Sequence, residues 1–342
     1  MAYRRVFAVG ASAGGIEALL AIVEELPAGL PAAILVVIHI SPDSPGYLPE
    51  ILSRNGPIPA TNAVEGTIMQ AGHIYVAPPD RHLLVNKMGK LETPRGPREN
   101  RSRPAIDPLF RSVALNFGAR AVGIVLSGGL DDGAAGLRAI KMCGGTSIVQ
   151  DPADATVNSM PLSAMRNATI DYCLPASEIA FRMSELADQE PERKIMVVEK
   201  QDRRQIEREV AIAGKSMEGL AIREFGTPSV FTCPECHGAL MRVRGDNPVR
   251  YRCHTGHAYT AEALLSELRE TTEQAIWGAV RSLHEEAMLF DHLAAHWEEV
   301  DLQTAKDYRE QARAILLRAD QIQRTTDEDP AQPALDAVTS NR

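Results

Sequence analysis

The sequence has no long hydrophobic run and no excess of basic residues. No stretch of about 18 consecutive apolar residues occurs, so a membrane-spanning helix is not expected. The first residues, MAYRRVFAVG, enter an apolar strand directly, without the hydrophobic segment of a signal peptide. The formal net charge of −9 has the wrong sign for a protein that binds mainly the phosphate backbone of nucleic acid. We therefore expect a cytoplasmic protein that neither inserts into a membrane nor binds nucleic acid.

Cysteine is also scarce, and its placement is informative. Three of the five cysteines, Cys233, Cys236 and Cys253, lie within 21 residues, which is typical of a metal site rather than a disulfide framework. They stand in the pattern CPEC, a gap of 16 residues, and then CHTGH. Three thiolates and one imidazole suit tetrahedral Zn²⁺ and leave no open position, so we predict a structural zinc ribbon; reduced thiols without metal are the alternative. Of the two histidines, His254 and His257, the wider spacing favours His257 as the fourth ligand.

Short apolar runs alternate with helical patterns in the first half of the chain. The runs include VFAVG, AAILVVIHI, AVGIVLSGG and GGTSIVQD. Runs without polar interruptions are typical of strands that are covered on both faces, and their alternation with helices predicts a parallel sheet. The predicted fold class is therefore α/β, with a doubly wound, mostly parallel and Rossmann-like sheet in residues 1–185. Within this domain, the basic stretch RGPRENRSRP at residues 95–104 is expected to be an exposed loop.

The rest of the chain is predicted to contain four further parts. Residues 186–228 are dominated by charge and are expected to form a linker or a solvated helix. Residues 229–260 hold the cysteine cluster and are expected to form the zinc ribbon. Apolar residues at helical spacing predict a helical hairpin over 261–325, with a stripe that packs either within the chain or against a partner. The polar residues 326–342 are expected to be a disordered tail.

A glycine-rich turn, GASAGG at residues 10–15, joins the first apolar strand to a helix. Two functions share such a turn. In a dinucleotide fold it binds a pyrophosphate, and the next strand ends in an acidic residue. In a hydrolase it presents a serine beside backbone N–H groups that bind an oxyanion. The next strand here ends in His39, which favours the hydrolase with Ser12 as nucleophile; the alternative is that Ser12 only caps the helix.

A second glycine-rich loop supplies a candidate carboxylate. The strand AVGIVL ends in SGGLDDG, which places Asp131 and Asp132 at a strand end and just before a helix. One of these carboxylates could orient the imidazole of His39, as the third member of a catalytic triad does. The other could simply cap the helix, and the residues alone do not choose between them.

Several blocks of the sequence resemble the CheB protein-glutamate methylesterases of bacterial chemotaxis. The blocks are the GASAGG turn, the strand that ends in His39, GGLDDGAAG (Gly128–Gly136), IYVAPPDRHL (Ile74–Leu83) and RPAIDPLFRSVA (Arg103–Ala114). The likeness covers roughly residues 4–182. It implies that Ser12 is the nucleophile, His39 the general base and Asp132 the orienting acid. It also implies that catalysis requires no cofactor.

The activity implied by this resemblance is removal of methyl esters from glutamate side chains of chemoreceptors, together with deamidation of receptor glutamines. A methylated chemoreceptor or a similar protein would be the substrate. The backbone N–H groups of Ala13, Gly14 and Gly129 would form the oxyanion hole. Ala13 replaces a frequent Thr, and Gly129-Leu130 replaces a frequent Met-Gly, but both changes keep the backbone donors.

Regulation is expected to differ from that of the typical family member. No receiver domain precedes the esterase-like residues in the sequence, so the usual control by phosphorylation is not expected within this chain. The predicted ribbon and hairpin could instead bind a regulatory protein or control access to the esterase. The alternative function is a non-catalytic regulatory or scaffold protein that uses the ribbon and the hairpin to bind partners.

Overall fold

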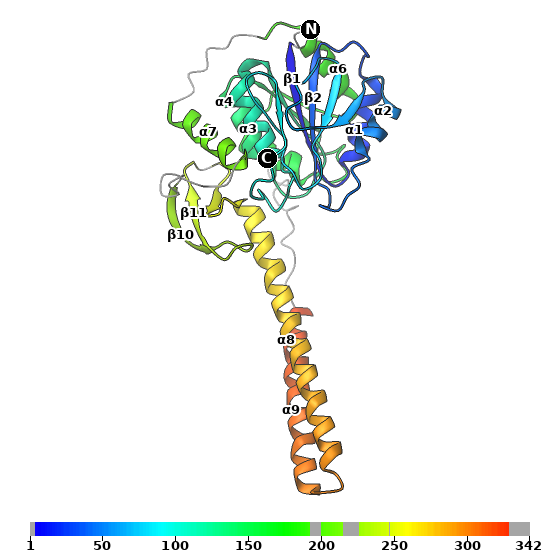
Figure 1. Ribbon diagram of the computed structural model, residues 1–342, viewed down its shortest axis with the longest axis vertical. Coiled ribbons are helices and arrows are strands. Elements are labelled where there is room, and N and C mark those ends of the chain that lie inside the picture. Colours follow the sequence, from blue (N-terminus) through cyan, green and yellow to red (C-terminus); the bar gives the residue numbers. More distant parts are fainter. Residues whose placement is uncertain (1–3, 192–199, 215–225, 246, 328–342) are drawn as a thin grey trace, which may run out of the picture. The chain divides into compact units, whose positions relative to one another are not determined.

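The computed structural model describes residues 4–191, 200–214, 226–245 and 247–327 (Figure 1). The chain divides into two compact units, Met1–Leu265 and Ser266–Arg342. Within the described residues, no helix combines the length and the apolar character needed to cross a membrane.

A seven-stranded sheet, in which every pairing is parallel, forms the centre of the first unit. Its strands, in spatial order, are β3 (Ala60–Asn62), β4 (His73–Val76), β2 (Ala32–Ile38), β1 (Arg5–Ala11), β7 (Ala121–Val125), β8 (Thr146–Gln150) and β9 (Tyr172–Leu174). Every residue of β1 and β2 is buried, as their unbroken apolar sequences predict. Strands β2, β3 and β4 lie on one side of β1, and the later strands β7, β8 and β9 lie on the other. A topological switch point therefore lies between β1 and β7. Ligands bind at such points, beyond the carboxyl ends of the strands.

Helices cover both faces of this sheet (Figure 1). One face carries α1 (Gly15–Glu25), α2 (Leu48–Asn55) and α6 (Ala176–Asp188), and the other carries α3 (Ile106–Phe117), α4 (Ala134–Met142) and α5 (Ser159–Asn167). Each helix layer packs its apolar residues onto the sheet, which gives two hydrophobic cores. A short 3₁₀ helix, Gly118–Arg120, and a two-stranded sheet of β5 (Leu84–Val85) and β6 (Leu91–Glu92) complete the layer arrangement. The predicted α/β fold class is confirmed.

A small antiparallel sheet of four strands follows the α/β layers. Its strands are β10 (Gly226–Thr232), β11 (Ala239–Val243), β12 (Arg250–Cys253) and β13 (Ala258–Thr260). Its core is small and includes Leu240, Tyr259 and Leu264. We call residues 226–260 the ribbon. The charged stretch predicted as a linker contains helix α7 (Lys200–Gly214), and its residues 192–199 and 215–225 lie outside the described part of the chain.

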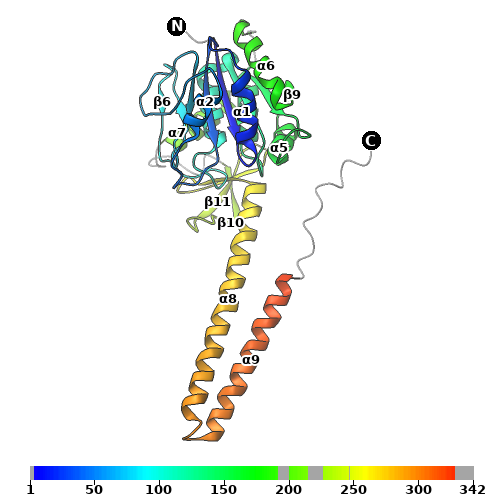
Figure 2. The same cartoon turned by 90° about the vertical axis from the view of Figure 1, so that its right-hand side faces the viewer.

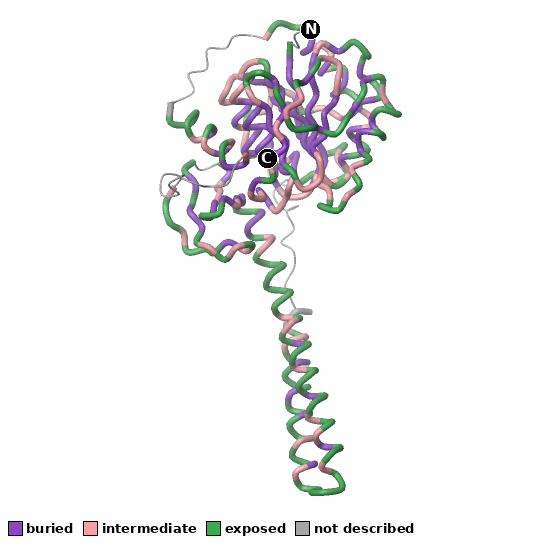
Figure 3. The backbone as a smooth tube through the Cα atoms, in the orientation of Figure 1, coloured by how far each residue is buried: buried purple, intermediate pink, exposed green. Residues whose placement is uncertain are grey.

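The helices α8 (Ala261–Trp297) and α9 (Leu302–Asp327) run side by side as a hairpin (Figure 2). Their shared core is small and centres on Ala287, Ala312 and Ile315. Most residues of the hairpin are exposed, whereas the central strands of the first unit are buried (Figure 3). The predicted disordered tail falls mainly on residues 328–342, which lie outside the described residues.

Candidate active site

The turn after β1 holds Ser12 at the carboxyl edge of the sheet. Gly14 adopts a φ of 70°, and helix α1 begins at the next residue. A Cβ atom on Gly14 would lie 2.5 Å from Cβ of Thr156 and 2.8 Å from Oγ of Ser127, so only glycine fits here. Oγ of Ser127 also donates a hydrogen bond to O of Ala13 over 2.7 Å. The turn is therefore held against the loop that follows β7.

His39 lies beside Ser12 because β1 and β2 are neighbours in register. Ala11 pairs with Ile38, so the next residues of both strands emerge at the same edge. The backbone N of His39 donates to O of Ala11 over 3.2 Å. Among the described residues, the hydroxyl of Ser12 makes no hydrogen bond to another protein group. The structure therefore brings Ser12 and His39 to adjacent strand ends without a direct bond between their side chains.

The imidazole of His39 contacts the carboxylate of Asp132. Nε2 of His39 lies 2.8 Å from Oδ2 of Asp132, and the two side chains are 17% and 2% exposed. The backbone N–H of Ile106 donates to Oδ2 over 2.7 Å, and that of Gly133 donates to Oδ1 over 2.9 Å. Burial would raise the pKa of Asp132, but the hydrogen bond and charge of His39 and the other donors outweigh it and lower that pKa. Asp132 is thus held as a carboxylate that can orient and stabilise an imidazolium.

The neighbouring carboxylate, Asp131, has a different partner. Its Oδ1 accepts a hydrogen bond of 2.7 Å from Oγ1 of Thr260, in strand β13 of the ribbon. Burial raises the pKa of Asp131 to about 7, against the hydrogen bond from Thr260, and the nearby charge of Glu262 adds to the increase. Of the two candidates left open by the residues, Asp132 contacts His39 and Asp131 contacts the ribbon.

The turn that holds Ser12 and the loop after β7 contain backbone N–H groups without a partner among the described residues. In the part of the chain that the structure describes, the N–H groups of Ala13, Gly14 and Gly129 donate to no protein acceptor. A Cβ atom on Gly128 would lie 2.8 Å from Cβ of Ser12 and 2.1 Å from Sδ of Met160, so glycine allows this loop to approach the serine closely. Free donors next to a serine are what an oxyanion hole requires.

Asn100 is a site residue that the sequence did not indicate. Its Nδ2 donates to Oδ1 of Asp132 over 2.9 Å and to Oδ2 of Asp107 over 3.2 Å. It lies in the stretch 95–104, which we expected to be exposed. That expectation was wrong for its centre, because Glu99 is 1% exposed and Asn100 is 7% exposed. The sequence offers one signal for Asn100, its position close to the RPAID block, but this position does not indicate a contact with Asp132.

Glu99 belongs to a buried ion-pair network that joins the α/β layers to the ribbon. Its Oε2 lies 2.6 Å from Nη2 of Arg111 in α3, and its Oε1 lies 2.8 Å from Nη2 of Arg252 in β12. Nη1 of Arg111 also lies 2.9 Å from Oε2 of Glu209 in α7. Glu209 in turn pairs with Arg250 of β12, whose Nη2 lies 3.0 Å from Oε1. Burial opposes the charge of Glu99, but Arg111 and Arg252 lower its pKa to about 2.

The ribbon gathers the predicted metal ligands. One ligand atom from each of Cys233, Cys236, Cys253 and His257 lies within 4.8 Å of the others. Sγ of Cys236 and Sγ of Cys253 are 3.6 Å apart, and Nδ1 of His257 is 3.6 Å from Sγ of Cys233. Bonds of about 2.3 Å to sulfur in a tetrahedral zinc site require ligand separations of just under about 4 Å. The four residues therefore form a group that could bind a metal ion.

The contacts around the two ribbon histidines distinguish them. Nε2 of His257 lies 3.3 Å from Oε2 of Glu235, which leaves Nδ1 facing the thiols. Metal-binding histidines commonly donate their second ring nitrogen to a carboxylate in this way. The ring of His254 lies against Gly238, where a Cβ would come within 2.2 Å of it. His257, favoured by spacing, is the histidine in the cluster.

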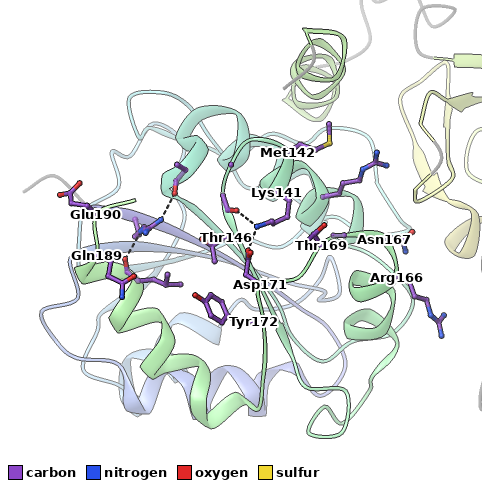
Figure 4. Close-up of a pocket in the computed structure, with 17 residues that line it drawn as sticks. Lys141, Met142, Thr146, Arg166, Asn167, Thr169, Asp171, Tyr172, Gln189 and Glu190 are labelled. Atoms are coloured by element: carbon purple, nitrogen blue, oxygen red, sulfur yellow. Dashed lines mark hydrogen bonds and ion pairs between the residues drawn. The ribbon is translucent and has the colours of Figure 1, made fainter. Parts of the chain in front are cut away.

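A cavity lies at the opposite end of the sheet (Figure 4). It measures about 900 Å³, and its lining includes Thr146 at the start of β8 and Asp171 just before β9. Asp171 is paired with Lys141, whose Nζ lies 2.5 Å from Oδ2. None of the candidate catalytic residues lines this cavity.

Comparisons with known proteins found matches to the α/β part of the chain. Residues 7–183 match the family model for CheB methylesterase. The crystal structure of the Thermotoga maritima CheB methylesterase catalytic domain matches with a TM-score of 0.51 and 31% identity, over 53% of this chain and 98% of that domain.

Two curated relatives have related names. A putative protein-glutamate methylesterase/protein-glutamine glutaminase from Leptospira interrogans is 39% identical over 172 residues, which are 50% of this chain and 89% of the relative. Protein-glutamate methylesterase/protein-glutamine glutaminase 2 from Xanthomonas oryzae pv. oryzae is 37% identical over 188 residues, which are 54% of this chain and 52% of the relative. The chain thus spans about half the length of the Xanthomonas protein.

Proposed function

Because this chain belongs to the CheB methylesterase family, we propose that it is a cytoplasmic serine hydrolase that removes methyl esters from glutamate side chains of chemoreceptors. The observation that carries the proposal is the contact between His39 and Asp132 beside Ser12, at neighbouring strand ends. The unpartnered N–H groups of Ala13 and Gly129 support it further. Deamidation of receptor glutamines would use the same site.

The orientation of His39 determines how the proton moves in this proposal. Nε2 of His39 donates to Asp132, so Nδ1 carries the lone pair that accepts the hydroxyl proton of Ser12. Oγ of Ser12 attacks the ester carbonyl, and the negative charge on the carbonyl oxygen is stabilised by the free backbone N–H groups. The bond to the methoxy group then breaks, and His39 returns the proton so that methanol leaves.

Water completes the cycle. His39 removes a proton from water as the water oxygen attacks the acyl group on Ser12. When the second tetrahedral intermediate collapses, the bond to Oγ of Ser12 breaks, His39 returns the proton to that oxygen, and the glutamic acid product loses its own proton to solvent. With a glutamine substrate the leaving group is ammonia, and the later steps are the same. The bond between Ser12 and His39 forms in the substrate complex, since catalytic hydrogen bonds often tighten only on substrate binding.

We also propose that the ribbon binds one structural Zn²⁺ through Cys233, Cys236, Cys253 and His257. Four protein ligands leave no position for substrate or water, so the metal would organise the ribbon and take no part in ester hydrolysis. Elemental analysis of the purified chain tests this assignment, and one equivalent of zinc is expected. Well under one equivalent in folded, reduced protein would refute it. A regulatory protein partner for the hairpin stays a prediction.

Methanol release from methylated chemoreceptor membranes tests the proposed activity. Wild-type protein should release methanol, Ser12→Ala should release none, and His39→Gln should be severely reduced. Circular dichroism must show that the three proteins are equally folded. Absence of release by folded wild-type protein would overturn the proposed substrate, and release by Ser12→Ala would overturn the proposed nucleophile.

A further inference from the structure

Asn100 connects the ribbon to the carboxylate that orients His39. Its amide side chain uses both ends: Nδ2 donates to Oδ1 of Asp132 over 2.9 Å, and Oδ1 accepts from the backbone N–H of Thr260 over 3.0 Å. Its own backbone N–H donates to O of Ala258 over 2.8 Å. Two of these three bonds go to strand β13 of the ribbon and one goes to Asp132. Nδ2 also donates to Oδ2 of Asp107 over 3.2 Å, so the ribbon contributes one contact to the side chain of Asn100 and one to its backbone.

The backbone of Asn100 is in a conformation that other side chains rarely adopt. Its φ is 49°, in the left-handed region, which asparagine tolerates better than most residues. The backbone N–H of Ala258 donates to O of Arg98 over 3.1 Å, and Glu99 and Ala258 form an isolated parallel bridge between the loop and β13. This pairing holds Asn100 in place against its unfavourable backbone conformation.

Two further contacts connect the same part of the ribbon to the same loops. Thr260 donates to Asp131, the residue next to Asp132. Arg252 of β12 forms a buried ion pair with Glu99, the residue next to Asn100. Breaking a buried ion pair on one side leaves an unpaired charge, so Arg252 opposes separation of the ribbon from this loop.

The metal cluster lies at the start of the same strand. His257 immediately precedes β13, and the backbone N–H of Cys253 donates to O of His257 over 2.9 Å. An ion held by Cys233, Cys236, Cys253 and His257 would fix the end of β12 and the start of β13 relative to each other. His257, a candidate metal ligand, is thus only three residues from Thr260, whose backbone N–H contacts Asn100.

From these contacts we propose that Asn100 is a positioning residue for Asp132, and that the metal-bearing ribbon acts through Asn100 to maintain the active site. The proposal rests on the proposed esterase function. Loss of the Asn100 amide removes one of the donors that orient the carboxylate, and loss of ribbon order removes the contacts that orient the amide. In both cases Asp132 holds the imidazole of His39 less precisely, which lowers the rate of the chemical steps and leaves substrate binding intact.

The first test replaces Asn100 in the full chain. We expect Asn100→Ala to lower kcat for methanol release about 10- to 100-fold while KM stays near the wild-type value, as for other residues that orient a catalytic group. Asn55→Ala is the matched control, because Asn55 is exposed and its amide contacts only its own helix. A wild-type kcat for Asn100→Ala would overturn the proposal.

The second test asks whether the ribbon acts through Asn100. Cys236→Ser removes one candidate metal ligand, and Cys173→Ser, at an exposed and unpaired cysteine, is its control. We expect Cys236→Ser to lower kcat in the wild-type background and to have little further effect when combined with Asn100→Ala. Fully additive losses would overturn the coupling. If Cys236→Ser does not fold, Arg252→Met replaces it in the same cycle, because Arg252 contacts Glu99 and is not a metal ligand.

A spectroscopic measurement separates this proposal from the proposed function. In protein with ¹⁵N-labelled histidine, the Nε2–H of His39 reports its bond to Asp132 even if the substrate has been misidentified. The signal is assigned among the nine histidines by its loss in His39→Gln. We expect Asn100→Ala to shift or broaden this signal and Asn55→Ala to leave it unchanged. An unchanged signal in Asn100→Ala would overturn the positioning role, whereas absence of methanol release by wild-type protein would overturn only the esterase function.

Discussion

His39 contacts Asp132 through Nε2, at 2.8 Å from Oδ2, and this leaves Nδ1 as the ring nitrogen available to Ser12. Asp132 accepts hydrogen bonds from His39, from backbone N–H groups and from Asn100, so all its described partners are donors. A carboxylate in such surroundings fixes both the tautomer and the orientation of the imidazole. The arrangement gives different expectations for the two adjacent aspartates.

Asp132→Asn should nearly abolish methanol release, whereas Asp131→Asn should retain most of it. An asparagine at 132 places an NH₂ group among donors, so it both loses the charge and favours the wrong tautomer of His39. We expect kcat to fall about 10³- to 10⁴-fold, as for the loss of the carboxylate from a catalytic triad. An asparagine at 131 can still accept the hydrogen bond from Thr260. Methanol release measured on both variants would contradict this assignment if Asp131→Asn were the more damaging change.

The pH dependence of stability should reveal Asp131. Its pKa is raised to about 7 by burial, against the hydrogen bond from Thr260, and the charges of Glu262, Asp107 and Asp132 contribute. Because the folded protein holds this proton more tightly, the associated stability is complete below the unfolded pKa near 4 and is lost as the pH rises to 7. The loss amounts to at most about 4 kcal/mol.

Urea unfolding from pH 4 to pH 8 tests this expectation. Asp131→Asn should be more stable than wild type at pH 8, and its advantage should shrink as the pH falls to 4. Asp107, whose pKa is also raised, to about 6, is present in both proteins, so the comparison isolates the loss of the Asp131 carboxyl together with its interaction with Asp107. Asp43→Asn, at an exposed residue, serves as the control. A constant difference between Asp131→Asn and wild type across this range would show that Asp131 is ionised normally.

Gly14→Ala should impair both folding and activity. The φ of 70° costs a residue with a side chain about 1–2 kcal/mol, and the new Cβ would also meet Thr156 at 2.5 Å. Movement of the turn would displace Ser12 and the free N–H groups, so kcat should fall at least about 10-fold. Gly29→Ala is the control, because a Cβ there would meet nothing within 4 Å. Equal effects of the two substitutions on the urea midpoint and on kcat would contradict this role for Gly14.

The sheet and the strand-end positions could be predicted because they depend on local patterns. Unbroken apolar runs such as Ala32–Ile38 are buried on both faces only in a covered parallel sheet, and the parallel direction brings their carboxyl ends to one edge. The closeness of His39 and Ser12, which follow two neighbouring parallel strands, could be predicted from that rule. Which of Asp131 and Asp132 contacts His39 could not be predicted in this way, because it depends on how the loop turns. Leu130, with a φ of 62°, takes a conformation that its side chain disfavours.

The role of the loop at residues 95–104 could not be predicted for a different reason. Its composition is charged, and charge usually indicates exposure. Glu99 and Asn100 are buried because they pair with Arg252 and Thr260 of the ribbon. These partners lie more than 150 residues away in the chain. Pairings at that separation leave no periodic or spacing signal in one sequence. The same holds for Glu209 in α7, which lies in a stretch that we interpreted as a linker or a solvated helix.

Glu99 should make the protein sensitive to acid. Arg111 and Arg252 overcome the cost of burial and lower the pKa of Glu99 from 4.5 to about 2. The resulting stability is present above the unfolded pKa and is lost as the pH falls from 4.5 towards 2, and it amounts to about 3 kcal/mol. Glu99→Gln removes this contribution and leaves two buried guanidinium groups with one carboxylate fewer, so a loss of about 3–5 kcal/mol is expected at pH 7.

Urea unfolding at pH 7, 5, 4 and 3 measures this contribution directly. The gap between wild type and Glu99→Gln should be widest at pH 7 and should narrow below pH 4.5, because Glu99 of the unfolded chain then takes up a proton while folded Glu99, with a pKa of about 2, stays ionised. Glu209, whose pKa is also lowered, is present in both proteins and keeps its own ion pairs with Arg111 and Arg250. Glu24→Gln, at an exposed position of α1, should leave stability unchanged within about 0.5 kcal/mol. A gap that is equally wide at pH 3 and pH 7 would mean that the substitution acts through packing, and that the charge of Glu99 does not hold the ribbon to this loop.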